Sequence, residues 1–363
     1  MPSKGSTMRS RPLAAVAAAL LAVTLAACSE AAATTPAADD TPDATLPTEV
    51  PAGTKLVVGD PSIKVAVALA GDDLDSDLGF EIEWANVSGG PATTEAFRAG
   101  SLDVGSVADI PPIHATWTGL DVRIVAASYR EDWEENPIYS FGVAPGVEGV
   151  ESLEDFEGHR IAYSPGQAQG TIVLRALQEA GLTTDDVELV ELPSTGDVYP
   201  TALAAKEVDI APLGGVAVAR YLDNYSKDGA HTIEHGLRDD PSVLYAPTST
   251  ISDPAKAAAL REYVQLWAAA RLWIYDHPEE WKAGYYVKDQ GLSEADADYL
   301  VEHAGIPDIP ADWAEPIARH QETINLLAEE TGNEKLDAAD LWDERFAPVV
   351  AEAVESYLAG ADG

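Results

Sequence analysis

Short apolar runs alternate with amphipathic stretches along the chain from Lys55 onward. Runs with the period and composition of β-strands are expected at 56–59, 80–87, 122–127, 139–143, 160–163, 187–192 and 208–211. Helices are expected between them at 93–99, 170–180, 197–205 and 214–223. Strands that alternate with helices of this length are typical of parallel sheets with helices on both faces.

The pattern changes after Ser252, where only helical periodicity remains. Asp253 and Pro254 together indicate a helix start, because Asp can cap the first N–H groups and Pro has no N–H that would need a partner. An apolar stripe at helical spacing follows, and further helices are expected at 293–303, 314–330 and 347–358. We therefore expect an α/β protein of two lobes with a helical C-terminal segment, a layout that hinged binding proteins share with other classes of protein.

The first 53 residues have a different character. Basic residues precede an apolar run at 13–25, and Leu25-Ala26-Ala27-Cys28 resembles a bacterial lipobox. We expect a signal peptide at 1–27 and lipid on Cys28, which would anchor the protein outside the cytoplasm. The alternative is an ordinary signal peptide with an incidental cysteine. Residues 28–53 are rich in Ala, Thr, Pro and Asp, which predicts a flexible tether.

The charge and the single cysteine exclude several functions. The chain has 62 acidic and 22 basic residues, and three basic ones (Lys4, Arg9 and Arg11) precede Cys28, so the remainder carries about −43. Such a charge argues against nucleic acid as a partner, because binding phosphates needs clusters of Lys and Arg. With Cys28 acylated, no thiol remains for a disulfide, a thiolate metal site or a cysteine nucleophile.

Four loops follow a predicted strand and precede a predicted helix, at 87–91, 105–112, 163–171 and 211–215. Ligands of open α/β sheets bind beyond the carboxyl ends of strands, where helix N-termini present free N–H groups. A plain strand-to-helix turn is the alternative for each loop, and Asp109 would then only cap its helix. The candidate ligand-binding residues on these loops are Ser88, Gly89, Gly90, Pro91, Asp109, Ile110, Gln167, Ala168, Gln169, Gly170, Thr171, Leu213 and Gly214.

Several motifs in order resemble the nitrate/sulfonate/taurine family of ABC-transporter substrate-binding proteins over about residues 55–345. They are Phe97-Arg-Ala-Gly-Ser-Leu-Asp-Val-Gly105 with Asp109-Ile-Pro-Pro112, then 152–162, 174–190, 205–209 and His277-Pro-Glu-Glu280. The resemblance implies the periplasmic-binding-protein-like fold, in which two α/β lobes hold the ligand between them. Lobe I would comprise 54–143 and 250–363, and lobe II 144–249. The hinge would lie near 141–145 and 245–250, and the partners would be an ABC permease and its ATPase.

Two departures from the family concern the pocket. Residues 211–215 lack the Trp that the family often has there, and 59–80 looks short for a first strand–helix unit. Family ligands are frequently anions, and Arg130 is the candidate local cation unless it pairs with Glu131 or Asp132. A zwitterionic or neutral solute fits as well as a simple anion.

The resemblance implies a monomeric receptor that uses no cofactor and no metal. Enzymes among the family's relatives depend on cysteine and histidine, and here the seven histidines are scattered along the chain. We therefore expect binding without catalysis. Two alternatives stay open: a receptor for a heterocyclic vitamin precursor, and a lipoprotein that senses its ligand without transport.

Overall fold

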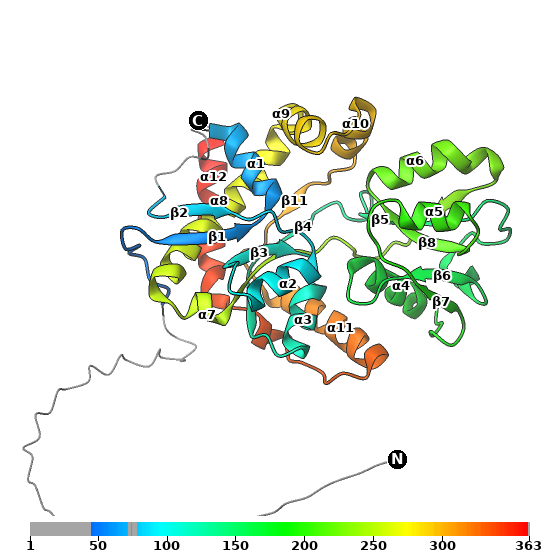
Figure 1. Ribbon diagram of the computed structural model, residues 1–363, viewed down its shortest axis with the longest axis horizontal. Helices are drawn as coiled ribbons and strands as arrows, with labels where there is room; N and C mark the ends of the chain where they lie inside the picture. Colours follow the sequence, from blue (N-terminus) through cyan, green and yellow to red (C-terminus); the bar gives the residue numbers. More distant parts are fainter. Residues whose placement is uncertain (1–44, 72–73, 75–77, 362–363) are drawn as a thin grey trace, which may run out of the picture. The chain divides into compact units, whose positions relative to one another are not determined.

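The computed structural model of the chain describes residues 45–71, 74 and 78–361 (Figure 1). The predicted signal peptide, Cys28 and most of the predicted tether lie outside the described residues. Within the described residues, no helix has both the length and the apolar character needed to cross a membrane.

The first sheet has six strands in the order β11-β4-β10-β3-β1-β2. β1 (Lys55–Gly59) pairs in parallel with β2 (Glu81–Trp84) and β3 (Val104–Val107). β10 (Ser242–Pro247) runs antiparallel between β3 and β4 (Val122–Arg130), and β11 (Pro307–Asp308) is an antiparallel edge. The expected parallel pairing holds for β1, β2 and β3, but the sheet is mixed, because β10 returns from the other sheet and enters this one from the opposite end.

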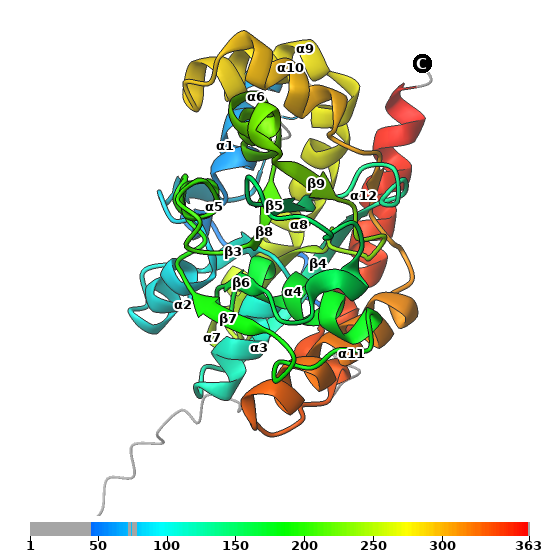
Figure 2. The same ribbon diagram turned by 90° about the vertical axis from the view of Figure 1, so that its right-hand side faces the viewer.

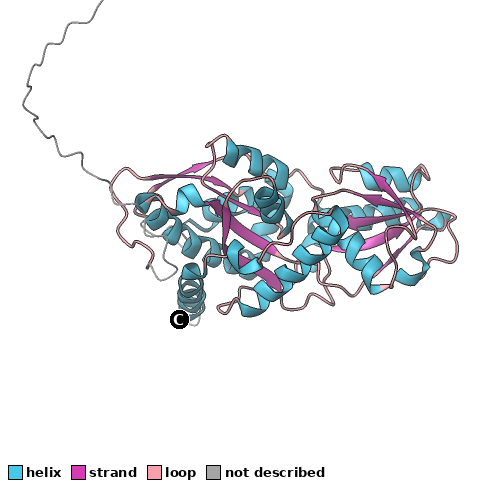
Figure 3. Ribbon diagram, turned by 90° about the horizontal axis from the view of Figure 1, so that it is seen from below, coloured by secondary structure: helices cyan, strands magenta, loops and turns pink. Residues whose placement is uncertain are grey.

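Helices cover both faces of this sheet, which together with them forms lobe I (Figures 1 and 3). The segment that looked short in the sequence holds a complete helix, α1 (Pro61–Ala70). The predicted start of α8 (Pro254–Asp276) is confirmed, since Asp253 accepts hydrogen bonds from the N–H groups of Ala255 and Lys256 at 2.9 and 3.2 Å. The other helices packed in this lobe are α2 (Gly90–Arg98), α3 (Ile110–Trp117), α7 (Thr248–Ile251) and α12 (Ala347–Ala361).

The second sheet has five strands in the order β7-β6-β8-β5-β9 and forms lobe II with its helices. β6 (Arg160–Tyr163) is parallel to β7 (Glu188–Glu191) and β8 (Ile210–Gly214), whereas β5 (Tyr139–Val143) is antiparallel to β8 and β9 (His231–Ile233). Two apolar clusters, one around Phe141 and Phe156 and one around Tyr199 and Tyr221, form its core. Figure 2 shows its helices α4 (Ala168–Glu179), α5 (Val198–Ala204) and α6 (Val216–Tyr225) around the sheet.

The chain passes between the two sheets twice, at 131–138 and at 234–241. The stretches predicted as the hinge, near 141–145 and 245–250, lie partly in strands instead: Phe141 is completely buried inside β5, and Tyr245 is completely buried inside β10. Each lies in a strand whose hydrogen bonds hold it in its own sheet. The hinge therefore stays a prediction. The boundaries proposed for the two lobes otherwise stay predictions.

The C-terminal segment contacts both lobes. It contains α9 (Pro278–Trp281), a π-helical stretch (Lys282–Asp289), α10 (Glu294–Glu302) and α11 (Ala314–Thr331), followed by short helices at Ala338–Leu341 and Glu344–Phe346. Asp296 of α10 pairs with Arg220 of α6 at 2.7 Å. Thr323 of α11 accepts a hydrogen bond from Arg175 of α4 at 2.5 Å. These helices thus form polar contacts with lobe II in addition to the two chain crossings.

Candidate functional site

The N-terminus of α3 places a carboxylate at the carboxyl end of β3. Asp109 precedes the helix, but its side chain makes no capping hydrogen bond, so the capping role considered above is wrong. Its Oδ2 accepts from Thr323 Oγ1 at 3.1 Å and lies 3.7 Å from Arg175 Nη2. Asp109 is only 5% exposed, and its Oδ1 has no hydrogen-bond partner among the described residues. A buried carboxylate oxygen in this state is costly unless a ligand or water satisfies it.

The N-terminus of α4 comes from lobe II and lies beside Asp109. Gln167 precedes this helix in an extended conformation and does not cap it with its side chain. A Cβ at Gly170 would lie 2.1 Å from the carbonyl oxygen of Ser164, so only glycine allows this close approach. Thr171 is 2% exposed and donates to the Gln167 carbonyl at 3.3 Å. Ala168 and Thr171 of this first turn line one of the pockets described below, so the positive end of the α4 dipole lies beside it.

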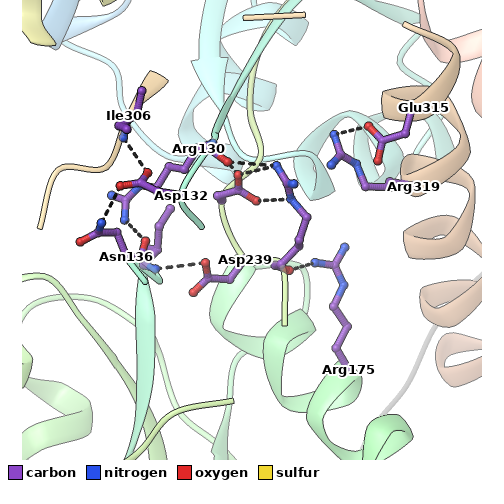
Figure 4. A network of polar contacts seen from close by, with 11 residues as sticks. Arg130, Asp132, Asn136, Arg175, Asp239, Ile306, Glu315 and Arg319 are labelled. Carbon is purple, nitrogen blue, oxygen red and sulfur yellow. Dashed lines mark hydrogen bonds and ion pairs between the residues drawn. The ribbon is translucent and has the colours of Figure 1, made fainter. Parts of the chain in front are cut away.

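The second crossing forms the third side of the site. Asp239 accepts hydrogen bonds from the backbone N–H groups of Ile138 and Tyr139 at 3.0 and 2.7 Å, as Figure 4 shows in part. Asp240 accepts from the N–H of Arg130 at 2.6 Å and pairs with Arg238 at 3.0 Å. These bonds join the two crossings to each other, which fixes the backbone on which the site is built.

Arginines surround Tyr129 next to these carboxylates. The guanidinium carbon of Arg319 lies 4.3 Å from the Tyr129 ring centroid, and that of Arg238 lies 5.6 Å from it. Arg175 donates to the Arg238 carbonyl at 2.6 Å, and Arg319 pairs with Glu315 at 2.9 Å (Figure 4). Burial raises the pKa of Tyr129, so it stays a neutral phenol at physiological pH. The arginines bring positive charge to the site, and the paired carboxylates of Asp240 and Glu315 offset part of it.

His320 of α11 connects this site to the body of lobe I. The indole Nε1–H of Trp342 donates to His320 Nδ1 at 3.0 Å, so the proton of the neutral ring is on Nε2, which donates to the Asp109 carbonyl at 3.0 Å. Burial lowers the pKa of His320, and the nearby Asp109 offsets part of this effect. His320 therefore remains neutral and orients the backbone of Asp109.

Two adjoining pockets open between these elements. The first is lined by Ala108, Asp109, Ile110, Ala168, Thr171, Ile172, Arg175, Asp239 and Pro241. The second shares Asp109, Arg175 and Pro241 with the first and is lined further by Tyr129, Arg238, Asp240, Pro316, Arg319, His320 and Trp342. Of the predicted site residues, the structure thus brings together Asp109 and Ile110 from one sheet with Ala168 and Thr171 from the other.

The remaining predicted residues do not line either pocket. Gln167 and Gln169 are half-buried at the start of α4. At the start of α2, Ser88, Gly89 and Pro91 are exposed, while Gly90 is buried and a Cβ there would lie 2.4 Å from Pro111 Cγ. Leu213 is 1% exposed in the core of lobe II, and Gly214 is packed against the ring of Tyr139.

Arg130 does not face either pocket. Its guanidinium donates to the Asn136 carbonyl within the first crossing and lies beneath Gly305. Neither of the anticipated partners, Glu131 or Asp132, forms an ion pair with it in the described part of the chain, and Asp132 instead accepts from the Ile306 N–H at 2.7 Å. Sequence reasoning missed Arg175 and His320, whose spacing along the chain gives no sign that they meet Asp109.

Comparison with known proteins identifies the family. The family described as NMT1/THI5 like matches residues 76–280, which is more than half of the chain. The chain belongs to the NMT1/THI5-like family. A putative aliphatic sulfonates-binding protein of Escherichia coli strain K12 is 32% identical over 108 residues, which cover 30% of this chain and 32% of that protein. The chain thus matches about a third of the length of that curated relative.

Solved structures show the same fold. The alkanesulfonate-binding protein SsuA of Xanthomonas axonopodis pv. citri, solved with MOPS bound, superposes with a TM-score of 0.66 at 21% identity, covering 81% of this chain and 99% of that one. The desulfurization enzyme DSZB superposes with a TM-score of 0.54 at 14% identity, covering 84% and 99%. The expected fold of two α/β lobes and the resemblance to substrate-binding proteins are confirmed, and the fold is one that a binding protein and an enzyme share.

Proposed function

We propose that this member of the NMT1/THI5-like family is an extracytoplasmic receptor that binds a small organic solute and delivers it to an ABC importer. The solute would lie in the pockets between α3 and α4 and be held by both lobes. The observation that carries the proposal is Asp109, a buried carboxylate at the carboxyl end of β3 with one oxygen that no residue in the described part of the chain satisfies. The sulfonate-binding relatives support the assignment.

The charges around the pockets favour a solute with two unlike ends. The free Oδ1 of Asp109 suits an ammonium or another N–H donor, and the N-terminus of α4 with Arg175 suits an anionic group. Asp239 and Asp240 balance most of the arginine charge, so a simple anion would gain less from this pocket than a zwitterion. We therefore propose a taurine-like aminosulfonate as the class of solute.

The route of delivery follows from the remaining sequence features. Lipid on Cys28 would anchor the protein to the membrane through the tether, and the monomer would present its lobes to a permease that an ATPase drives. Closure of the lobes would bend the crossings at 131–138 and 234–241, where the chain leaves one sheet and has not yet entered the other. The solute would be released unchanged, which NMR of the ligand after incubation with the protein tests directly.

Calorimetric titration with matched ligands tests the proposal. Taurine and ethanesulfonate differ only in the ammonium group, so taurine should bind the chain more tightly. Asp109→Asn should weaken taurine binding about 10-fold or more, because a charged hydrogen bond contributes about 1.5–3 kcal/mol. Asp121→Asn, at an exposed residue away from the pockets, serves as the control and should bind as the unaltered chain does.

Each other outcome selects a different function. Binding of ethanesulfonate as tight as that of taurine would reject the zwitterion while leaving a sulfonate receptor. Failure to bind any sulfonate, with binding of a pyrimidine instead, would support the receptor for a heterocyclic vitamin precursor. Tight taurine binding without uptake by cells that carry the permease and ATPase would favour a sensor.

A further inference from the structure

Three side chains of α8 form a polar stripe inside lobe I. Tyr263, Trp267 and Arg271 recur at intervals of four residues, and this spacing places them on one face of the helix. α8 packs against both β1 and α1, and Asp60 lies between these two elements, directly after β1 at the carboxyl edge of the sheet. We call these four residues the α8 chamber. It is separate from the two pockets described above and shares no residue with them.

Each residue of the α8 chamber has a polar atom that no described residue satisfies. These atoms are Asp60 Oδ2, Tyr263 OH, Trp267 Nε1 and Arg271 Nε, and all are shielded from solvent. Asp60 is 2% exposed, and Tyr263 and Trp267 are completely buried. Four such atoms in one place are unusual, since buried polar groups are nearly always hydrogen-bonded to protein or to ordered water.

The members of the α8 chamber interact with one another. The Arg271 guanidinium carbon is 4.7 Å from the Trp267 ring centroid, and Arg271 Nη2 donates to Ser242 Oγ at 2.8 Å. Burial raises the pKa of Tyr263 well above its ordinary value, the Asp60 charge adds to that rise, and Arg271 opposes it. Both charged groups therefore act electrostatically on the Tyr263 hydroxyl.

We propose that the α8 chamber is a binding site for ordered water. The occupant must donate to Asp60 Oδ2 and accept from Arg271 Nε and Trp267 Nε1, and water does both. An anion would be repelled by Asp60 and a cation by Arg271, and the two charges cancel. A water molecule is stable in such a place when it has two to four polar partners.

The water would connect the first helix of the lobe to its longest one. Asp60 Oδ1 already caps α1, accepting from Ile63 N at 3.2 Å and from Ser62 Oγ at 2.6 Å. Its second oxygen would be tied through water to α8. The water would thus fix the turn between β1 and α1 at the sheet edge, in addition to the packing of α1 against α8.

Thermal unfolding of Tyr263→Phe in the full chain distinguishes a filled chamber from an empty one. If water bridges the hydroxyl, its removal costs a hydrogen bond, and Tm should fall by about 2 °C. If nothing binds the hydroxyl, Phe removes an unsatisfied buried group, and Tm should stay or rise, which would overturn the proposal. Tyr221→Phe is the benchmark, because that hydroxyl donates directly to the Val143 carbonyl at 2.7 Å.

A crystal structure of the full chain at 2 Å resolution or better is the second test. Density for water within hydrogen-bonding distance of at least three of the four atoms would confirm the site. An empty chamber, a bound ion, or a direct Asp60–Arg271 pair would each overturn the proposal.

Discussion

Replacing His320 by alanine removes the side chain that holds the backbone of Asp109 in place. The ring is 2% exposed and has a partner at each nitrogen: the Trp342 indole at 3.0 Å and the Asp109 carbonyl at 3.0 Å. Alanine satisfies neither of them. Both the indole N–H and the carbonyl would then be buried without a partner.

The cost follows from those two groups. A buried donor or acceptor left unsatisfied costs about 1–3 kcal/mol, so His320→Ala should lower the free energy of unfolding by about 3 kcal/mol or more. That is a large part of the roughly 5–15 kcal/mol by which folded domains are usually stable. Chemical denaturation with urea at pH 7.5 measures the change as a shift of the midpoint at constant slope.

The control variant replaces a histidine that is less buried than His320. His303 is half-buried at the end of α10, where its ring stacks on Tyr299 at 4.1 Å. His303→Ala should cost less than about 1 kcal/mol. If His320→Ala costs no more than this control, the two hydrogen bonds do not stabilise the fold, and the account of the Asp109 backbone fails.

The pH dependence gives a second readout for the same residue. Burial lowers the pKa of His320 in the folded state below the ordinary value of 6.5. Below about pH 6.5 this histidine is protonated in the unfolded chain but stays neutral in the folded chain. The free energy of unfolding should therefore fall as pH drops below about 6.5, and above that pH it should not depend on this group. His320→Ala should flatten the dependence between pH 6.5 and 5, and an unchanged slope would refute the assignment of a buried neutral ring.

Two further predictions concern α4 and the contact of α10 with lobe II. Gly170→Ala should destabilise the protein and weaken solute binding at least 10-fold, because the new Cβ would lie 2.1 Å from the Ser164 carbonyl oxygen. Gly360→Ala is the control, since a Cβ there meets nothing within 4 Å, and it should have little effect on either property. Calorimetric titration and urea denaturation measure the two effects. Arg220 lowers the pKa of Asp296 to about 2, so this pair should stabilise the fold above pH 4 and lose that effect as pH falls toward 2. Arg220→Met should remove this part of the acid transition, and an unaltered acid transition would contradict it.

The order of elements follows closely from local pattern. The start of α8 at Asp253 and Pro254 was predictable because capping depends only on neighbouring residues. β5 and β6 lie where the apolar runs place them. The loops before α3 and α4 were likewise found as candidate binding segments, since carboxyl ends of strands and helix N-termini are recognisable from adjacent residues.

Other features could not be predicted from the sequence, because they depend on residues far apart in the chain. β10 was not expected as a strand, and its antiparallel place between β3 and β4 reverses the predicted parallel order. The crossings at 131–138 and 234–241 also lie away from the stretches expected as the hinge, because where a strand ends is set by its partners across the sheet as well as by its own residues.

The sequence by itself determined the alternation of strands and helices, the resemblance to substrate-binding proteins and the two loops that carry Asp109 and Thr171. Only the tertiary structure decided the composition of the site. It brought His320 to Asp109 across 211 residues, added Arg175 and directed Arg130 away from the pockets. Local sequence sets backbone period and turns, whereas the partner of a buried charge is whichever group the packing of distant elements places beside it.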